Sequence, residues 1–403
     1  MASKRIEVSL KVVYSLLFVG SIISAAFASD EITVENRVSY LGRPSVVMIT
    51  TEYNGYLLND DGKHSVFLFK GDDEVSELEV QIPQFYVGYS GSGFVVNSDG
   101  YIVTNAHVVQ ETEEELKAEF ARQALEWAAR EFPPTYIANG KDPYPVTEED
   151  LQWLYNLFLA EYDLDYKREI MVYFGAPSIL DRSPVGYPAE IRKISPQEVW
   201  YSYGDYKYRS GKDLAIIKIE TSNDLPTATL GNSKDVEVGD KVVVIGYPGV
   251  TTSWQNAFLS PETEYVPSVT SGIISAEKRL PDKSEVFQTD AAIYHGNSGG
   301  PAFNAEGEVI GIATFGSGRT LVSGEWLDVQ GYNFLIPINV AKSFISELNI
   351  DTTPSEVTQH FERGFELYWN GSRPEARGEF DAILALDPNN QYATEYSSMA
   401  QRG

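Results

Sequence analysis

A serine set between glycines is the residue of this sequence best suited to nucleophilic chemistry. Ser298 lies in the motif GNSGGP at residues 296–301. Glycines on both sides let the backbone turn tightly, which exposes the hydroxyl and aims backbone amides at an oxyanion forming beside it. A serine hydroxyl also needs a base to remove its proton and a third group to orient that base. The sequence must therefore supply a histidine and a carboxylate.

His107 and Asp213 are the candidates for these two roles. His107 directly follows a strand-like run, and Asp213 heads a run of apolar residues. The serine motif also fits the G-x-S-x-G pattern of α/β-hydrolases, in which the histidine follows the serine. After Ser298, however, the only histidine is His360, in the C-terminal tail. The order His107, Asp213, Ser298 is instead that of the chymotrypsin group.

Six blocks of sequence, in this order, resemble the HtrA/Deg family of serine proteases. They are SGSGF (90–94), TNAHVV (104–109), DLA (213–215), TDAAI (289–293), GNSGGP (296–301) and GYNFLIP (331–337). The resemblance covers roughly residues 43–348. It implies a mainly β, chymotrypsin-like fold of two antiparallel six-stranded β-barrels with the active site between them. In this family the triad would be His107, Asp213 and Ser298, and the chain would be a serine endopeptidase.

The resemblance also implies the parts of the site that touch substrate. The amides of Gly296 and Ser298 would form the oxyanion hole. The S1 pocket, which receives the side chain before the cleaved bond, would be lined by Ile293, Ile312, Ala313, Thr314, Phe334 and Leu335. None of these residues is acidic, so we expect small or medium aliphatic side chains in S1. The PDZ domain that commonly follows this protease domain is expected to be absent here.

We expect three regions along the chain. Residues 1–28 predict a signal peptide or an anchor, with basic residues, an apolar stretch and a final Ala-x-Ala motif. Residues 29–350 would form the protease domain, including a flap at 52–88 and a helical insertion at 111–169. Residues 353–403 would form a small α-helical tail.

Periodicity supports both helical regions. In the insertion, Leu116, Phe120, Ala124 and Trp127 fall on one helical face. In the tail, the spacing of Gly364, Ala376, Phe380 and Pro388 resembles one tetratricopeptide repeat, in which a small residue marks the contact of two helices. One repeat cannot normally bury its own apolar face, so the tail should pack on the β body or on another chain.

The composition of the chain excludes some kinds of binding partner and site. The 403-residue chain has a formal net charge of −27 and no cysteine. Such a charge repels nucleic acid, and the absence of cysteine excludes disulfides and thiolate metal sites. No metal or cofactor motif is visible, so we expect none. The expected partners are polypeptide substrates, with a protein partner or self-association through the tail as a further option and a membrane only through an uncleaved N-terminus.

The sequence thus predicts an extracytoplasmic endopeptidase that acts on unfolded or misfolded proteins, the substrate class resting on the family resemblance alone. Two alternatives stay open at this point. The chain could be a peptide-binding, chaperone-like adaptor that uses the protease fold as a scaffold. It could also be a latent protease whose insertion or flap gates the cleft.

Overall fold

The computed structural model describes residues 32–68, 78–131, 148–178, 184–195, 200–203, 206–209, 212–249, 260–280, 282–320 and 326–402. The predicted signal segment at residues 1–28 lies outside them. Within the described part of the chain, no helix is both long enough and apolar enough to cross a bilayer.

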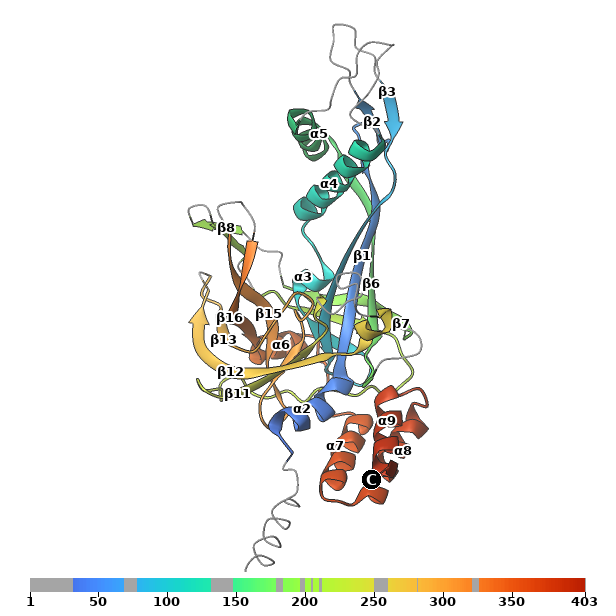
Figure 1. Ribbon diagram of the computed structural model, residues 1–403, viewed down its shortest axis with the longest axis vertical. Helices are drawn as coiled ribbons and strands as arrows, with labels where there is room; N and C mark the ends of the chain where they lie inside the picture. Colours follow the sequence, from blue (N-terminus) through green and yellow to red (C-terminus); the bar gives the residue numbers. More distant parts are fainter. Residues whose placement is uncertain are drawn as a thin grey trace, which may run out of the picture.

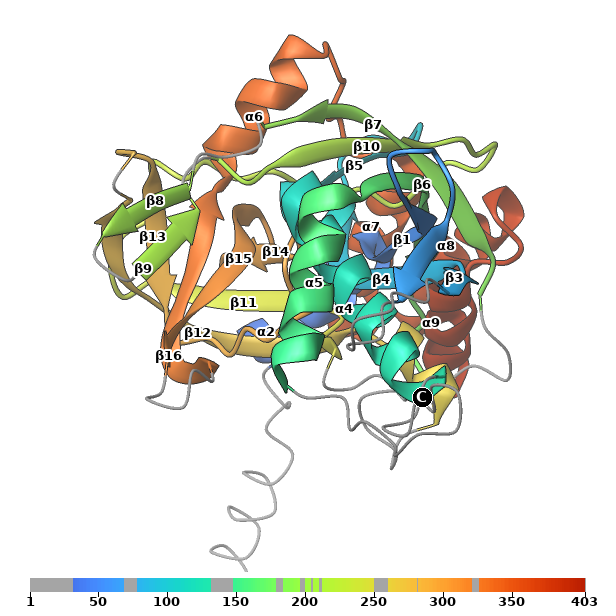
Figure 2. The same ribbon diagram turned by 90° about the horizontal axis from the view of Figure 1, so that it is seen from above.

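Two closed antiparallel barrels of six strands form the body, which confirms the predicted fold class. The first barrel runs in the order β1 (Val46–Leu58), β4 (Phe85–Val95), β5 (Tyr101–Thr104), β10 (Ala215–Ile219), β7 (Gly186–Ile194) and β6 (Asp163–Phe174). The second runs β11 (Lys241–Gly246), β12 (Ser268–Arg279), β13 (Glu285–Thr289), β16 (Trp326–Pro337), β15 (Val309–Thr320) and β14 (Pro301–Phe303). Figure 2 shows the two barrels beside each other.

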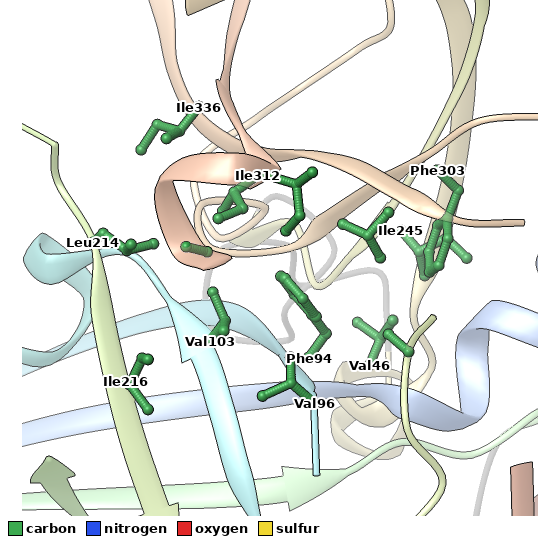
Figure 3. Close-up of a cluster of buried hydrophobic side chains, with 14 of the residues drawn as sticks. Val46, Phe94, Val96, Val103, Leu214, Ile216, Ile245, Phe303, Ile312 and Ile336 are labelled. Atoms are coloured by element: carbon green, nitrogen blue, oxygen red, sulfur yellow. The ribbon is translucent and has the colours of Figure 1, made fainter. Parts of the chain in front are cut away.

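A shared apolar core joins the barrels. Figure 3 shows side chains of both gathered in one cluster, with Phe94 and Ile216 from the first barrel and Ile245 and Ile312 from the second. All four side chains are completely buried. Full burial of a side chain of this size stabilises the fold by about 1.5–3 kcal/mol relative to exposure. The two barrels are therefore packed as one body, and the loops between them can hold a site in fixed geometry.

Strands β1 and β6 of the first barrel extend beyond it into an arm. β1 is buried on both faces over its first four residues and then alternates, with Tyr53 and Leu57 on the buried side. In Figure 1, β1 and β6 rise from the barrel to α4 (Glu113–Glu131) and α5 (Glu148–Glu161). The short hairpin β2 (Ser65–Leu68) and β3 (Leu78–Gln81) lies at the same end.

The helices of the arm bury the predicted face against the extended strands. Leu116, Phe120 and Ala124 of α4 are buried in a cluster with Tyr53 of β1, and Trp127 packs against that cluster. The segment 111–169 is not helical throughout, because residues 163–169 belong to β6 and pair with β1. These seven residues are almost all exposed, so they show no apolar alternation that would indicate a strand.

The C-terminal tail is helical, as expected. It consists of α7 (Glu356–Trp369), α8 (Arg373–Leu386) and α9 (Gln391–Arg402), which follow α6 (Ile338–Glu347). Gly364 of α7 lies against Phe380 of α8, so that a Cβ atom there would stand 2.6 Å from the ring. This close approach agrees with the spacing of a helical repeat, although the repeat assignment itself stays a prediction.

The tail packs on the body of its own chain. The ring centroid of Tyr40, in α2 (Val34–Gly42), lies 4.9 Å from that of Phe365. The Tyr396 hydroxyl donates a hydrogen bond to the carbonyl oxygen of Tyr40. On the other side, Thr358 bonds the backbone of Thr227. Figure 1 shows α2 between the barrels and the tail.

The remaining elements are short. They are α3 (Ala106–Val109), the hairpin of β8 (Trp200–Tyr203) and β9 (Tyr206–Arg209), and 3₁₀ turns at Arg43–Ser45 and Pro261–Tyr265.

Candidate active site

His107 and Asp213 meet at the junction of the two barrels. His107 is in α3, a single turn that follows β5, and Asp213 lies just before β10, which pairs with β5. The Nδ1 atom of His107 lies 2.8 Å from Oδ2 of Asp213, and the backbone N–H of His107 donates to Oδ1 over 3.1 Å. With Nδ1 donating to the carboxylate, the Nε2 atom of the ring is left as the base.

The Asp213 carboxylate is held by a further hydroxyl. Oγ1 of Thr314 donates to Oδ2 of Asp213 over 2.8 Å. Burial by itself raises the pKa of this carboxyl, but the charge of His107 and the hydrogen bonds of His107 and Thr314 outweigh it, so that the pKa lies below its ordinary value. The group therefore stays ionised and can stabilise a positive imidazolium.

The backbone of Asp213 is strained. Its φ of +41° places a non-glycine residue in the left-handed region. Its carbonyl oxygen accepts a hydrogen bond of 2.9 Å from the side-chain amide of Asn105, two residues before His107. Residues held in such conformations cluster at functional sites, where the surrounding structure fixes them.

Ser298 lies in a turn that only glycine allows at two positions. Gly296 has φ +94° and Gly299 has φ +86°. A Cβ atom at Gly296 would stand 2.3 Å from the carbonyl oxygen of Tyr247, and one at Gly299 would stand 2.1 Å from that of Ser92. Neither position has space for any side chain.

Ser92 ties this turn to the first barrel. Its hydroxyl donates to the carbonyl oxygen of Gly296 over 2.7 Å, and its backbone N–H donates to the carbonyl oxygen of Ser298 over 2.8 Å. Within the described residues, the N–H groups of Gly296 and Ser298 donate to no acceptor. Two backbone donors are thus available beside the Ser298 hydroxyl, which is the arrangement an oxyanion hole requires.

The Ser298 hydroxyl itself donates to the carbonyl oxygen of Thr314 over 2.8 Å. Thr314 therefore contacts two members of the triad, with its carbonyl oxygen on Ser298 and its hydroxyl on Asp213. Before attack, the Ser298 hydroxyl must exchange this acceptor for the Nε2 atom of His107.

The residues expected in S1 fall into separate groups. Ile293, Ala313 and Leu335 are buried in one apolar cluster of the second barrel. Ile312 belongs to the core between the barrels, as Figure 3 shows. Phe334 is half-buried, and Thr314 is buried with its hydroxyl on Asp213. The structure thus brings three of the six together as an apolar group.

The supporting contacts of Asn105, Ser92 and the Thr314 hydroxyl are visible only in the structure. Asn105 and Ser92 stand inside the recognised motifs, so their positions were visible while their contacts were not. Thr314 is 101 residues from Asp213. A single hydrogen bond between such distant residues produces no repeating pattern in the sequence from which it could be predicted.

Comparisons with known proteins place this chain near serine proteases. The trypsin-like peptidase domain family matches residues 91–151 and 179–312, which include all three triad residues. A protein of Chlamydia pneumoniae named "Probable periplasmic serine endoprotease DegP-like" is 30% identical over 284 residues, which are 69% of this chain and 38% of that protein. A protein of the same name from Pseudomonas fulva (strain 12-X) is 42% identical over 139 residues, 34% of this chain and 25% of that protein.

Among solved structures, "HtrA-type protease AlgW with decapeptide" aligns with 82% of this chain and 68% of that chain, at 24% identity and a TM-score of 0.40. The chain spans from a quarter to two fifths of the length of the two curated relatives described above. Over residues 91–151 and 179–312 the chain thus matches the trypsin-like peptidase domain family, and it is similar to proteins named DegP-like serine endoproteases.

Proposed function

We propose that this chain is a serine endopeptidase that hydrolyses peptide bonds through an acyl-enzyme. Ser298 Oγ attacks the carbonyl carbon of the substrate while His107 Nε2 takes its proton. The C–N bond then breaks, and His107 returns the proton to the departing amine. Water hydrolyses the resulting ester by the same route. Asp213 keeps the imidazole in the required tautomer and stabilises it when charged.

The observation that carries this proposal is the set of hydrogen bonds on Asp213. Its carboxylate accepts from the ring and the backbone of His107 and from Thr314. A carboxylate that served only to stabilise the fold would need no histidine fixed in one tautomer. The amides of Gly296 and Ser298, which donate to no acceptor among the described residues, support the same mechanism, because loss of one such donor costs about 2.7–4 kcal/mol of transition-state stabilisation.

For the substrate class, we propose unfolded or misfolded proteins outside the cytoplasm. The relatives are named periplasmic endoproteases, and the N-terminal segment of this chain predicts export. The buried group of Ile293, Ala313 and Leu335 supports S1 specificity for small or medium aliphatic side chains. A cleavage profile dominated by lysine or arginine before the cut bond would contradict this specificity.

Latency is the second candidate, and the bond from Ser298 to the Thr314 carbonyl favours it. In that state the hydroxyl proton is directed away from His107. If the state persists when substrate is present, the chain needs an activating partner.

The test is hydrolysis of unfolded casein by the natural chain and by Ser298→Ala. We expect cleavage by the natural chain only, because removal of the nucleophile leaves about 10³–10⁴-fold acceleration over water, which is invisible in such an assay. Equal cleavage by both would contradict the role of Ser298. Absence of cleavage by the folded natural chain would favour latency or the adaptor hypothesis.

A further inference from the structure

A groove of about 970 Å³ lies beside Asp213 but outside the catalytic turn. Asp213 and Thr314 line it, whereas His107 and Ser298 do not. One wall is formed by residues 277–280 and 283–287 of the β12–β13 hairpin, and the other contains the first residues of α6. The groove is therefore distinct from the site of peptide attack, although the two share the carboxylate that orients His107.

The lining of this groove is cationic in a chain of net charge −27. The basic residues that line it are Lys212, Lys234, Lys278, Arg279 and Lys283. All four lysines are exposed, and none of them forms an ion pair with another described residue. These side chains therefore have charge available for a ligand.

The acidic residues of the lining neutralise only part of this charge. Arg279 pairs with Glu285 over 2.7 Å. Asp213 is already engaged by His107 and Thr314. Glu277 is then the one carboxylate of the lining left to balance the four lysines. An excess of positive charge remains in the groove.

Apolar side chains lie between the cations. Leu280 and Val340 line the groove and are half-buried, with Val286 and Phe287 buried beneath. A sulfated polysaccharide would bring only polar groups against Leu280 and Val340. A long nucleic acid or polysaccharide, with a charge on every unit, would also meet more of the repulsion of the acidic chain than a short peptide does. A short peptide with both carboxylates and an apolar side chain matches the two kinds of surface together.

We propose that this groove binds an acidic, partly apolar segment of a partner polypeptide. Carboxylates of the segment pair with Lys212, Lys234, Lys278 and Lys283, and an apolar side chain packs on Leu280 and Val340. The bound segment lies next to Asp213, so this partner site adjoins the catalytic carboxylate without occupying the cleft.

The test uses the full chain carrying Ser298→Ala, so that the probe is not cleaved and the result does not depend on proteolysis. The probe is a fluorescein-labelled dodecapeptide of alternating glutamate and leucine, followed by fluorescence anisotropy. We expect saturable binding that weakens as salt rises, since exposed charge pairs are screened. The same peptide with glutamine in place of glutamate should bind at least several-fold more weakly.

Two double variants distinguish binding in the groove from attraction by the net charge of the chain. Lys278→Gln with Lys283→Gln should weaken binding by about 2- to 30-fold, the range for two exposed ion pairs. Lys117→Gln with Lys167→Gln makes the same change of net charge on the arm and should leave binding unchanged. Circular dichroism checks that each variant is folded.

Three results would overturn the proposal. They are absence of binding at low salt, equal loss of binding in both double variants, and equal binding of the glutamine peptide. Tighter binding of heparin than of the acidic peptide, lost in the groove variant alone, would assign the groove to a polyanion instead.

Discussion

Asp213 combines a strained backbone with an ionised side chain. Its φ of +41° is unfavourable for most residues, but aspartate and asparagine tolerate this region better than others do. The contacts of Asn105, His107 and Thr314 hold the residue there. Asparagine can therefore replace it with little change in backbone, which isolates the effect of the charge.

Asp213→Asn should lower kcat by about 10⁴-fold with the fold intact, because an amide favours the wrong tautomer of His107. Stopped assays on a peptide ester would measure this loss. A variant that is folded and retains most of its kcat would contradict the assigned role.

The effect of Asp213→Asn on stability should depend on pH. The pKa of Asp213 is lower in the folded chain than its ordinary value of 3.8. Its contribution to stability is therefore present above about pH 4 and is lost as pH falls through the folded pKa. The difference in unfolding free energy between the natural chain and Asp213→Asn should be larger above about pH 4 than below it, and should shrink in acid. A difference that grows in acid, in urea unfolding at several pH values, would show the opposite sign.

Gly296 and Gly307 offer a matched pair of substitutions. Both have positive φ, +94° and +89°, but a Cβ atom at Gly307 meets nothing within 4 Å. Gly296→Ala should distort the turn that carries the oxyanion amide and lower kcat by about 10²–10³-fold. Gly307→Ala should be folded and fully active. It should lose only some stability, because alanine is strained at this positive φ. Equal activity of the two variants in the same assay would show that the Gly296 turn does not support catalysis.

At the scale of elements, the short helix α3 is fastened by the strands of the arm. The Thr51 hydroxyl donates to the carbonyl oxygen of Val108 over 2.7 Å. The Tyr53 hydroxyl accepts from the backbone N–H of Glu111 over 2.9 Å. These contacts fix the chain directly after His107, the proposed base, so a change in the arm is expected to shift His107.

Tyr53→Phe should therefore lower kcat with KM unchanged, since the segment after His107 loses a buried acceptor. Tyr162→Phe is its control, because the Tyr162 hydroxyl donates to Ser65 in the same apolar cluster but away from His107. Each loss should cost about 1–3 kcal/mol of stability. Kinetics and urea unfolding of both variants test this, and an equal kcat in both would contradict the connection.

The tail offers a second comparison between elements. A Cβ atom at Gly364 would stand 2.6 Å from the buried Phe380 ring, whereas one at Gly378 meets nothing within 4 Å. Gly378→Ala should stabilise α8 by about 0.5–1 kcal/mol through helix propensity. Gly364→Ala should destabilise the tail by about 1–3 kcal/mol through overpacking. Thermal unfolding of both variants measures the change in stability, which should be positive for Gly378→Ala and negative for Gly364→Ala. Stabilisation by both substitutions would show that the helices do not touch at Gly364.

Across the whole molecule, the features that can be predicted from the sequence are those with periodic apolar spacing and those that lie in recognisable motifs. The two barrels and the buried face of α4 follow from apolar spacing and from the family resemblance. The strand at residues 163–169 cannot be predicted from sequence, because all but one of its residues are exposed and buried and exposed positions do not alternate. The packing of Tyr40 on the tail joins segments more than 300 residues apart, which no local pattern encodes.

In the candidate site, too, the motif residues could be predicted from the sequence, whereas their contacts could not. The triad residues were identified singly, from motifs separated by 106 and 85 positions. Their meeting, the Thr314 hydroxyl on Asp213 and the placement of Ile312 in the core between the barrels depend on how the two barrels pack. Such contacts between distant segments are set by tertiary structure.

The most direct test of the central claim is covalent labelling by diisopropyl fluorophosphate, read by mass spectrometry. An activated serine hydroxyl displaces fluoride and keeps the phosphoryl group. We predict one adduct, on the peptide that contains Ser298, with strong slowing by His107→Ala and no adduct in Ser298→Ala. A folded natural chain that takes up no label, or that labels equally fast after His107→Ala, would contradict the account.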